Sequence, residues 1–170
     1  MKLLKKYFEN ILLFKILKYK DKRGSFFETY NQELKKKYLR KSFSYDAISI
    51  NKKNVFRGIH YQTEYEQAKI VSVIEGKIID VVVDVRRNSK TFMKYKKIIL
   101  SDKNNRILYI PAGYAHGFLV LSNKAIVSYK ISNAYKKKNE KTILWNDKRL
   151  NLKLPKTIQN KIITSKKDSG

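Results

Sequence analysis

The chain has 170 residues, of which 42% are hydrophobic and 31% charged, a composition typical of one globular domain and unlike a disordered chain. It contains no cysteine, which excludes disulfide bonds and thiol chemistry and suits a reducing, cytoplasmic compartment. The formal charge is +25, but lysine far outnumbers arginine and is spread along the whole chain. Because duplex readers rely mainly on arginine for base edges, we expect no specific nucleic-acid partner and interpret the charge as lysine bias across a solvated surface. A positive field that draws in an anionic substrate is the functional alternative.

The first residues, Met1 to Lys6, resemble the start of a signal peptide. The apolar stretch that follows is interrupted by Glu9, Asn10 and two lysines, and no small-residue cleavage site follows it. No apolar run approaches the roughly 20 residues that span a bilayer. We therefore expect this segment to be part of the fold and expect no membrane partner.

The period of the hydrophobic residues is mostly two, which indicates strands. In chain order we expect a helix over 31–38, then strands at 43–50, 69–74, 77–85, 95–100, 106–110, 118–121 and 125–131, and a short helical turn over 156–161. Glu75 and Gly76 form a hairpin turn between two of these strands. Short strands at this spacing predict an all-β sandwich or barrel with minor helices, as a single domain over 1–170.

Only two histidines are present, His60 and His116, and each lies beside a glycine and an aromatic residue in what we interpret as a Gly-rich turn next to a strand. A lone histidine is more often structural than catalytic, but loops on a rigid scaffold often carry function. Two histidines without cysteine, in no H-x-H or H-x-x-x-H pair, argue against a metal site, so we expect no metal. The sequence also lacks the nucleophile-elbow, phosphate-loop and dinucleotide-binding glycine motifs, which leaves general acid–base chemistry without a bound cofactor.

Six blocks, in order, resemble the dTDP-4-dehydrorhamnose 3,5-epimerase family over about residues 8–168. They are DKRGSFFE at 21–28, NVFRGIHYQ at 54–62, Lys69 and Gly76 with DVVVDVR at 80–86, IPAGYAHGF at 110–118, ILWND at 143–147 and SKKD at 165–168. The resemblance implies a cupin-type jelly-roll β-barrel. It also implies a homodimer in which a segment of about residues 8–30 is exchanged between subunits.

The resemblance further implies a role for each matching residue. His60 would remove a proton next to a ketone, Asp168 would orient His60, Tyr129 would return a proton to the opposite face, and Lys69 would hold the enolate oxygen. Substrate-site positions fall on Arg23, Glu28, Arg57 and His116, the first two serving the neighbouring subunit. Taken without the resemblance, Tyr129 reads as a core aromatic and Lys69 as a residue that protects a strand edge.

The implied substrate is a nucleotide-diphospho-4-keto-6-deoxy sugar of surface-polysaccharide biosynthesis, inverted at C3 and C5. Inversion needs a base on one face and an acid on the other, and a fixed ammonium stabilises the enolate between the two steps. The chain departs from the family pattern at Ser25, at 45–49 and at Ala134, which leaves a dTDP-hexose and a GDP-heptose both open as substrate. C3-only epimerisation, a non-catalytic cupin binding module, a sugar ketoisomerase and a nucleic-acid-binding protein are the alternatives.

Overall fold

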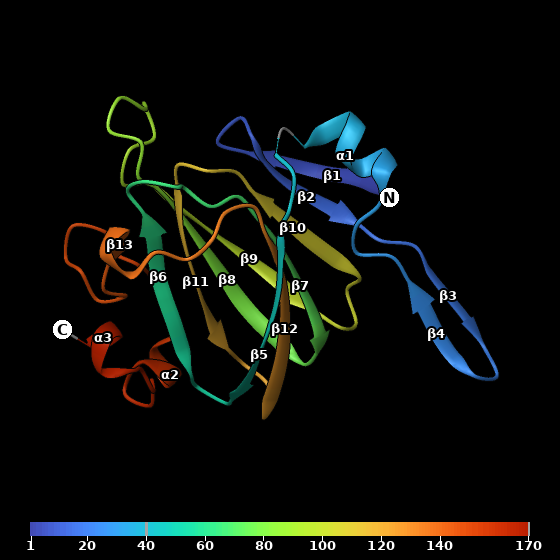
Figure 1. The fold of residues 1–170 in the computed structure, drawn as a ribbon. Coiled ribbons are helices and arrows are strands. Elements are labelled where there is room, and N and C mark those ends of the chain that lie inside the picture. The colour runs from blue at the N-terminus through green and yellow to red at the C-terminus, as the bar shows by residue number, and fades with distance from the viewer. Residues whose placement is uncertain (40, 170) are drawn as a thin grey trace.

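The computed structural model describes residues 1–39 and 41–169, which form two antiparallel sheets that face each other (Figure 1). The six-stranded sheet has the order β1-β2-β10-β7-β12-β5 and the five-stranded sheet the order β13-β6-β11-β8-β9. A separate two-stranded hairpin, β3-β4, projects away from the body of the molecule (Figure 1). The all-β, cupin-type prediction is therefore confirmed.

The strands account for most of the regular structure. They are β1 Lys2–Tyr7, β2 Ile11–Lys15, β3 Lys18–Asp21, β4 Gly24–Phe27, β5 Tyr45–Lys52, β6 Phe56–Gln62, β7 Lys69–Glu75, β8 Lys77–Asp84, β9 Tyr95–Ser101, β10 Arg106–Ile110, β11 Tyr114–Val120, β12 Lys124–Ile131 and β13 Glu140–Thr142. The helices are α1 Gln32–Tyr38, α2 Lys156–Gln159 and α3 Lys166–Ser169, with a short 3-10 turn, η1, at Lys137–Asn139. Among residues 1–39 and 41–169, no helix is long and apolar enough to cross a bilayer.

Apolar residues pack in three layers. The central layer fills the space between the two sheets and includes Val71, Val82, Phe118 and Val127. A second layer lies between the five-stranded sheet and the C-terminal segment, and a third lies between the six-stranded sheet and the α1 region. Because successive side chains of a strand point to opposite faces, each sheet contributes one face to the central layer and one to an outer layer.

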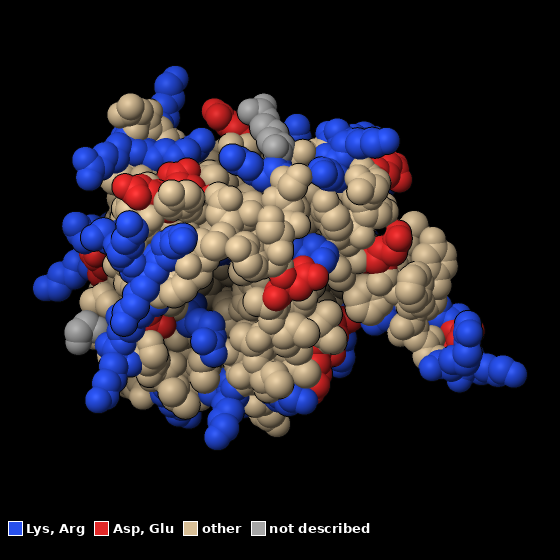
Figure 2. All heavy atoms as spheres, viewed as in Figure 1, with Lys and Arg blue, Asp and Glu red and all other residues tan. Residues whose placement is uncertain are grey.

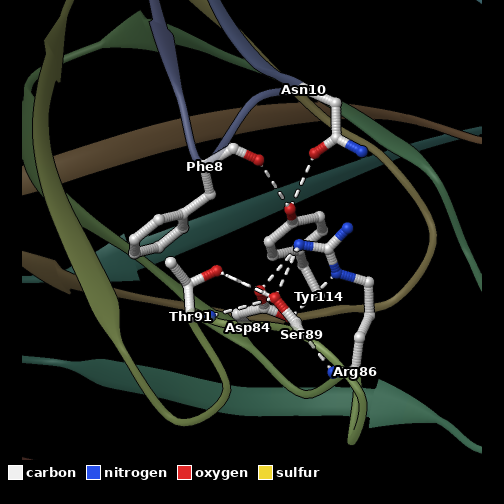
Figure 3. A network of polar contacts seen from close by, with 7 residues as sticks. All are labelled: Phe8, Asn10, Asp84, Arg86, Ser89, Thr91 and Tyr114. Carbon is white, nitrogen blue, oxygen red and sulfur yellow. Dashed lines mark hydrogen bonds and ion pairs between the residues drawn. The ribbon is translucent and has the colours of Figure 1, made fainter.

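The turn between β1 and β2 is joined to the loop after β8 by a polar network (Figure 3). The Arg86 guanidinium donates two hydrogen bonds to the Asp84 carboxylate, at 2.9 and 2.7 Å, and lies over the Tyr114 ring with its centre 4.6 Å from the ring centroid. The single hydroxyl hydrogen of Tyr114 is shared between Phe8 O, at 3.1 Å, and Asn10 Oδ1, at 2.7 Å. This network closes one end of the structure and anchors β11, which carries His116 two residues further on.

Two sequence-based expectations were wrong. His60 and His116 do not lie in turns: they lie inside β6 and β11, opposite each other in the antiparallel register. The neighbouring glycines suggested turns, but their role is to let the backbones of β6 and β11 approach each other closely. A Cβ on Gly58 would lie 2.6 Å from His116 O, and one on Gly117 would lie 2.8 Å from Arg57 O.

The N-terminal strands β1 to β4 and the strand β6 were also not expected from periodicity. Lysines alternate poorly with apolar residues in the first four, and glycine interrupts the pattern in β6. The other expected strands are present, with ends that differ by up to four residues, and the expected first helix is present as α1. Its Asn31 side chain caps it by accepting a hydrogen bond from Leu34 N at 2.9 Å.

Candidate active site

The site lies between the two sheets, on their facing surfaces. The five-stranded sheet contributes His60, His116 and Asp80, and the six-stranded sheet contributes Lys69 and Tyr129. The rings of His116 and Tyr129 lie edge to face across the gap, with centroids 6.4 Å apart. The structure therefore brings together four of the residues singled out from the sequence, from strands far apart in the chain.

His60 is held by the C-terminal helix α3. Its Nε2 atom lies 2.6 Å from Asp168 Oδ1, and the other oxygen of this carboxylate accepts a hydrogen bond from Gly58 N at 3.2 Å. Asp168 is only 3% exposed, because the chain before α3 returns along the start of β6, where Ile163 bonds to the backbone on both sides of Val55. A carboxylate two residues before the last position is therefore fixed in place.

A second carboxylate approaches His60 from the other side. Glu140, the first residue of β13, has Oε1 at 3.8 Å from His60 Nδ1. Its other oxygen accepts hydrogen bonds from the Tyr135 hydroxyl, at 2.9 Å, and from the Lys167 ammonium. The sequence reasoning assigned no role to Glu140 or Lys167, although Lys167 lies within the SKKD block and Glu140 lies shortly before the ILWND block.

Burial lowers the pKa of His60, and the hydrogen bond and charge of Asp168 oppose this shift. A lowered pKa keeps the imidazole neutral at neutral pH, as a general base must be before it accepts a proton. Asp168 also fixes the ring and compensates the charge that His60 acquires in doing so.

Lys69 opens β7 with its ammonium group in the interior. Burial lowers its pKa to about 8, and the nearby carboxylates of Asp80 and Glu140 oppose this shift. Among the described residues, none forms a hydrogen bond or an ion pair with the ammonium group of Lys69. The ammonium group is thus a hydrogen-bond donor that remains available to a bound molecule. The charges of Asp80 and Glu140 act on it.

His116 forms a second histidine–carboxylate pair. Its Nε2 atom lies 2.8 Å from Asp80 Oδ2, and both side chains are almost fully buried. Asp80 Oδ1 has no hydrogen-bond partner within the described chain. Since buried carboxylate oxygens are usually satisfied, this atom is an open acceptor that faces the interior near Lys69.

The Tyr129 side chain, on β12, forms a hydrogen bond with a side chain of the neighbouring strand β5. Its hydroxyl lies 3.0 Å from Ser49 Oγ, and Ser49 is linked through Asn51 to the Arg57 guanidinium. Burial raises the pKa of Tyr129 above its usual range, while Ser49 and the Arg57 charge oppose the shift. The phenol therefore keeps its proton at neutral pH. Ser49 and Asn51 are further residues that the sequence reasoning missed, and their polar side chains on an alternating strand were the available signal.

The structure does not bring Arg23 and Glu28 to this cluster. The Arg23 side chain is 84% exposed at the turn of the β3-β4 hairpin, where it pairs with Asp21 at 2.6 Å. Glu28 is exposed and accepts a hydrogen bond from Asn31 at 3.1 Å. No group of three or more His, Cys, Asp or Glu is placed to hold a metal ion among residues 1–39 and 41–169.

Figure 2 shows lysine and arginine mainly around the edges of the visible face, with several acidic residues among them and a hollow near its centre. This distribution matches the expectation of lysine spread over a solvated surface. Together, the fold and the cluster define an all-β enzyme of cupin type that is equipped for acid–base chemistry.

Comparisons with known proteins narrow this class. The family model for dTDP-4-dehydrorhamnose 3,5-epimerase matches residues 5–170. A dTDP-4-dehydrorhamnose 3,5-epimerase of Shigella flexneri is 40% identical over 173 residues, which cover 100% of this chain and 94% of the relative. The chain belongs to the dTDP-4-dehydrorhamnose 3,5-epimerase family, which confirms the predicted resemblance and the isomerase activity.

Solved structures of similar fold are also sugar epimerases. The dTDP-6-deoxy-D-glucose-3,5-epimerase of Legionella pneumophila Philadelphia 1, in complex with dTDP-4-keto-L-rhamnose, has a TM-score of 0.93 and 34% identity, covering 99% of this chain and 89% of that chain. ChmJ, a 3'-monoepimerase from Streptomyces bikiniensis in complex with dTDP-quinovose, has a TM-score of 0.89 and 26% identity, covering 99% of this chain and 84% of that chain. The same fold thus carries epimerases of one centre and of two.

Proposed function

We propose that this protein inverts C3 and C5 of a nucleotide-diphospho-4-keto-6-deoxy sugar through enolate intermediates, with His60 as base and Tyr129 as acid. The observation that carries the proposal is their placement. His60 lies on one sheet and Tyr129 on the other, and both face the same interior. A sugar between the sheets presents one face of its ring to each, which is what inversion of a carbon centre requires.

Each step then has a defined proton path. Neutral His60 takes the proton from the carbon next to the C4 ketone, and Asp168 stabilises the imidazolium that forms. The electron pair moves to the ketone oxygen, where the Lys69 ammonium stabilises the negative charge. Tyr129 gives its proton to the same carbon from the opposite face. Because C3 and C5 both flank the C4 ketone, one ammonium serves both centres.

Substrate binding is assigned to charged groups near this path. Arg57 and His116 would contact the substrate in this chain, while Arg23 and Glu28 would act in the partner subunit of a homodimer. The hairpin supports this exchange: Leu17, Tyr19 and Phe26 are 61%, 62% and 69% exposed, and such apolar surface is usually covered by a partner. We place the enzyme in the cytoplasm, as one domain over 1–170.

The test is a panel of dTDP- and GDP-linked 4-keto-6-deoxy sugars, followed by NMR in D₂O. We expect deuterium at C3 and at C5 of the product, and no exchange with His60→Asn. Deuterium at C3 alone would contradict the two-centre assignment and establish C3-only epimerisation. Exchange that persists in His60→Asn would overturn the assignment of the base.

A further inference from the structure

Tyr129 is the last member of a hydrogen-bonded chain that starts at a permanent positive charge. The Arg57 guanidinium donates from Nε and Nη2 to Asn51 Oδ1, at 3.2 and 3.1 Å. Asn51 Nδ2 donates to Ser49 Oγ at 2.9 Å, and Ser49 Oγ lies 3.0 Å from the Tyr129 hydroxyl. The two links of this chain, Asn51 and Ser49, have no role in the mechanism above.

The direction of this chain is determined by the groups at Asn51. A guanidinium only donates, so the amide oxygen of Asn51 must face Arg57. The amide nitrogen then faces Ser49, and its two hydrogens are shared among Ser49 Oγ and the backbone oxygens of Ser49 and Ala125, at 3.1 and 3.2 Å, which only accept. Two independent sets of partners therefore fix the amide of Asn51, which is 3% exposed, in one orientation.

The same logic extends to the hydroxyl groups. Ser49 Oγ already accepts a hydrogen bond from Asn51, which leaves its own hydrogen for the Tyr129 oxygen. If Ser49 donates this hydrogen bond, the Tyr129 hydroxyl does not donate to Ser49, and its hydrogen remains available for transfer to the substrate carbon. The opposite arrangement, with Tyr129 donating to Ser49, would turn the acidic proton away from the substrate.

We propose that Ser49 and Asn51 are positioning residues that direct the proton of Tyr129 toward the substrate and stabilise the tyrosinate formed when it is transferred. This inference rests on the proposed function of Tyr129 as the acid. In the step, the Tyr129 O–H bond breaks and a C–H bond forms at the enolate carbon. The negative charge left on the phenol oxygen is then met by the Ser49 hydroxyl hydrogen. The shift in the pKa of Tyr129 agrees, since burial raises it and the Ser49 hydrogen bond opposes that rise.

A weaker acid slows inversion more than it slows proton removal. In D₂O, an enolate that waits for Tyr129 takes deuterium back from His60 on the original face, so the recovered substrate becomes labelled without inversion. The ratio of labelled substrate to inverted product, measured by NMR, therefore reports on the acid alone. A loss of packing would lower both quantities together.

Ser49→Ala is the first variant. We expect inversion to fall roughly 10- to 100-fold, the range for a hydrogen bond to a developing charge, while label in recovered substrate changes less than about twofold. Ser49→Thr keeps the hydroxyl and should restore most of the inversion. The double variant Ser49→Ala with Tyr129→Phe should be no slower than Tyr129→Phe alone, because the two residues act as one unit.

Asn51→Asp reverses the polarity of the chain with nearly the same shape. Its carboxylate would draw the Ser49 hydrogen toward itself, so Ser49 would have to accept the proton of Tyr129. Inversion should then fall as in Ser49→Ala, although every hydroxyl is present. The new carboxylate would also face two backbone oxygens, which destabilises the fold, so a melting curve checks that this variant is folded. If it is not, the Ser49 variants alone test the inference.

The outcomes separate this inference from the proposed function. If Tyr129→Phe leaves inversion intact, the acid is misassigned and the inference falls with it. If Tyr129→Phe blocks inversion but Ser49→Ala has the wild-type ratio, only the inference is wrong. Additive losses in the double variant would likewise contradict it.

Discussion

Replacing Asp168 by Asn tests how the C-terminal carboxylate acts on His60. The carboxylate oxygen is 2.6 Å from His60 Nε2, and the Asp168 side chain is 4% exposed, so solvent hardly weakens the interaction. A hydrogen bond to a charged group contributes about 1.5–3 kcal/mol, which corresponds to roughly a 10- to 150-fold loss in the rate of proton removal. The variant keeps the size of the side chain and an acceptor for Gly58 N.

The pH dependence gives a second, independent signature. His60 must be neutral to act as base, so activity falls as the pH drops through the His60 pKa. Asp168 raises that pKa against the larger effect of burial. Without the carboxylate the pKa falls further, so the acidic limb of the exchange rate should move to lower pH while the plateau drops.

The assay is the rate of solvent deuterium exchange at C3 between pH 4 and 9. Asp147→Asn is the matched control, since Asp147 pairs with Arg149 at 2.7 Å and forms no hydrogen bond or ion pair with His60; it should leave both plateau and limb unchanged. An acidic limb that stays in place or moves to higher pH in Asp168→Asn would refute the reasoning, and so would an unchanged plateau.

Three other substitutions follow from the same geometry. Lys69→Met should reduce the exchange rate about 10²- to 10³-fold, and it should remove an alkaline limb that we expect near the Lys69 pKa of about 8, since the ammonium is lost as pH rises; a pH–rate profile from 6 to 10 tests both. Asp84→Ala should cost about 3–5 kcal/mol of unfolding free energy at pH 7, measured with urea, because burial disfavours this carboxylate but its hydrogen bonds outweigh that effect and hold its pKa well below the usual range. That stability is present above the unfolded pKa of about 4 and is lost as pH falls toward the folded value, so the difference from wild type should be smaller at pH 3. Gly58→Ala should destabilise by at least about 2 kcal/mol, since the new Cβ would lie 2.6 Å from His116 O, whereas Gly24→Ala, with nothing within 4 Å, should cost less; equal losses would contradict the packing argument.

The sequence by itself determined the class of fold and the identity of the catalytic candidates. Alternating apolar residues specify strands because successive side chains of a strand face opposite sides, and this signal was clear for β7, β8, β10 and β12. It failed for β6, where Gly58 breaks the alternation. A glycine is required there because the backbone of β11, almost sixty residues further along the chain, leaves no room for a Cβ atom. No local sequence pattern could reveal this requirement.

Only the tertiary structure decided how the candidates act. Asp168 looked like part of a frayed end, yet the pairing of Ile163 beside Val55 brings it against His60. Glu140, Ser49 and Asn51 carry no motif of their own. They became part of the site because β13 and β5 place them beside His60 and Tyr129. Hydrogen bonds act over about 3 Å, a distance that residues far apart in sequence reach only when strand order and register are complete.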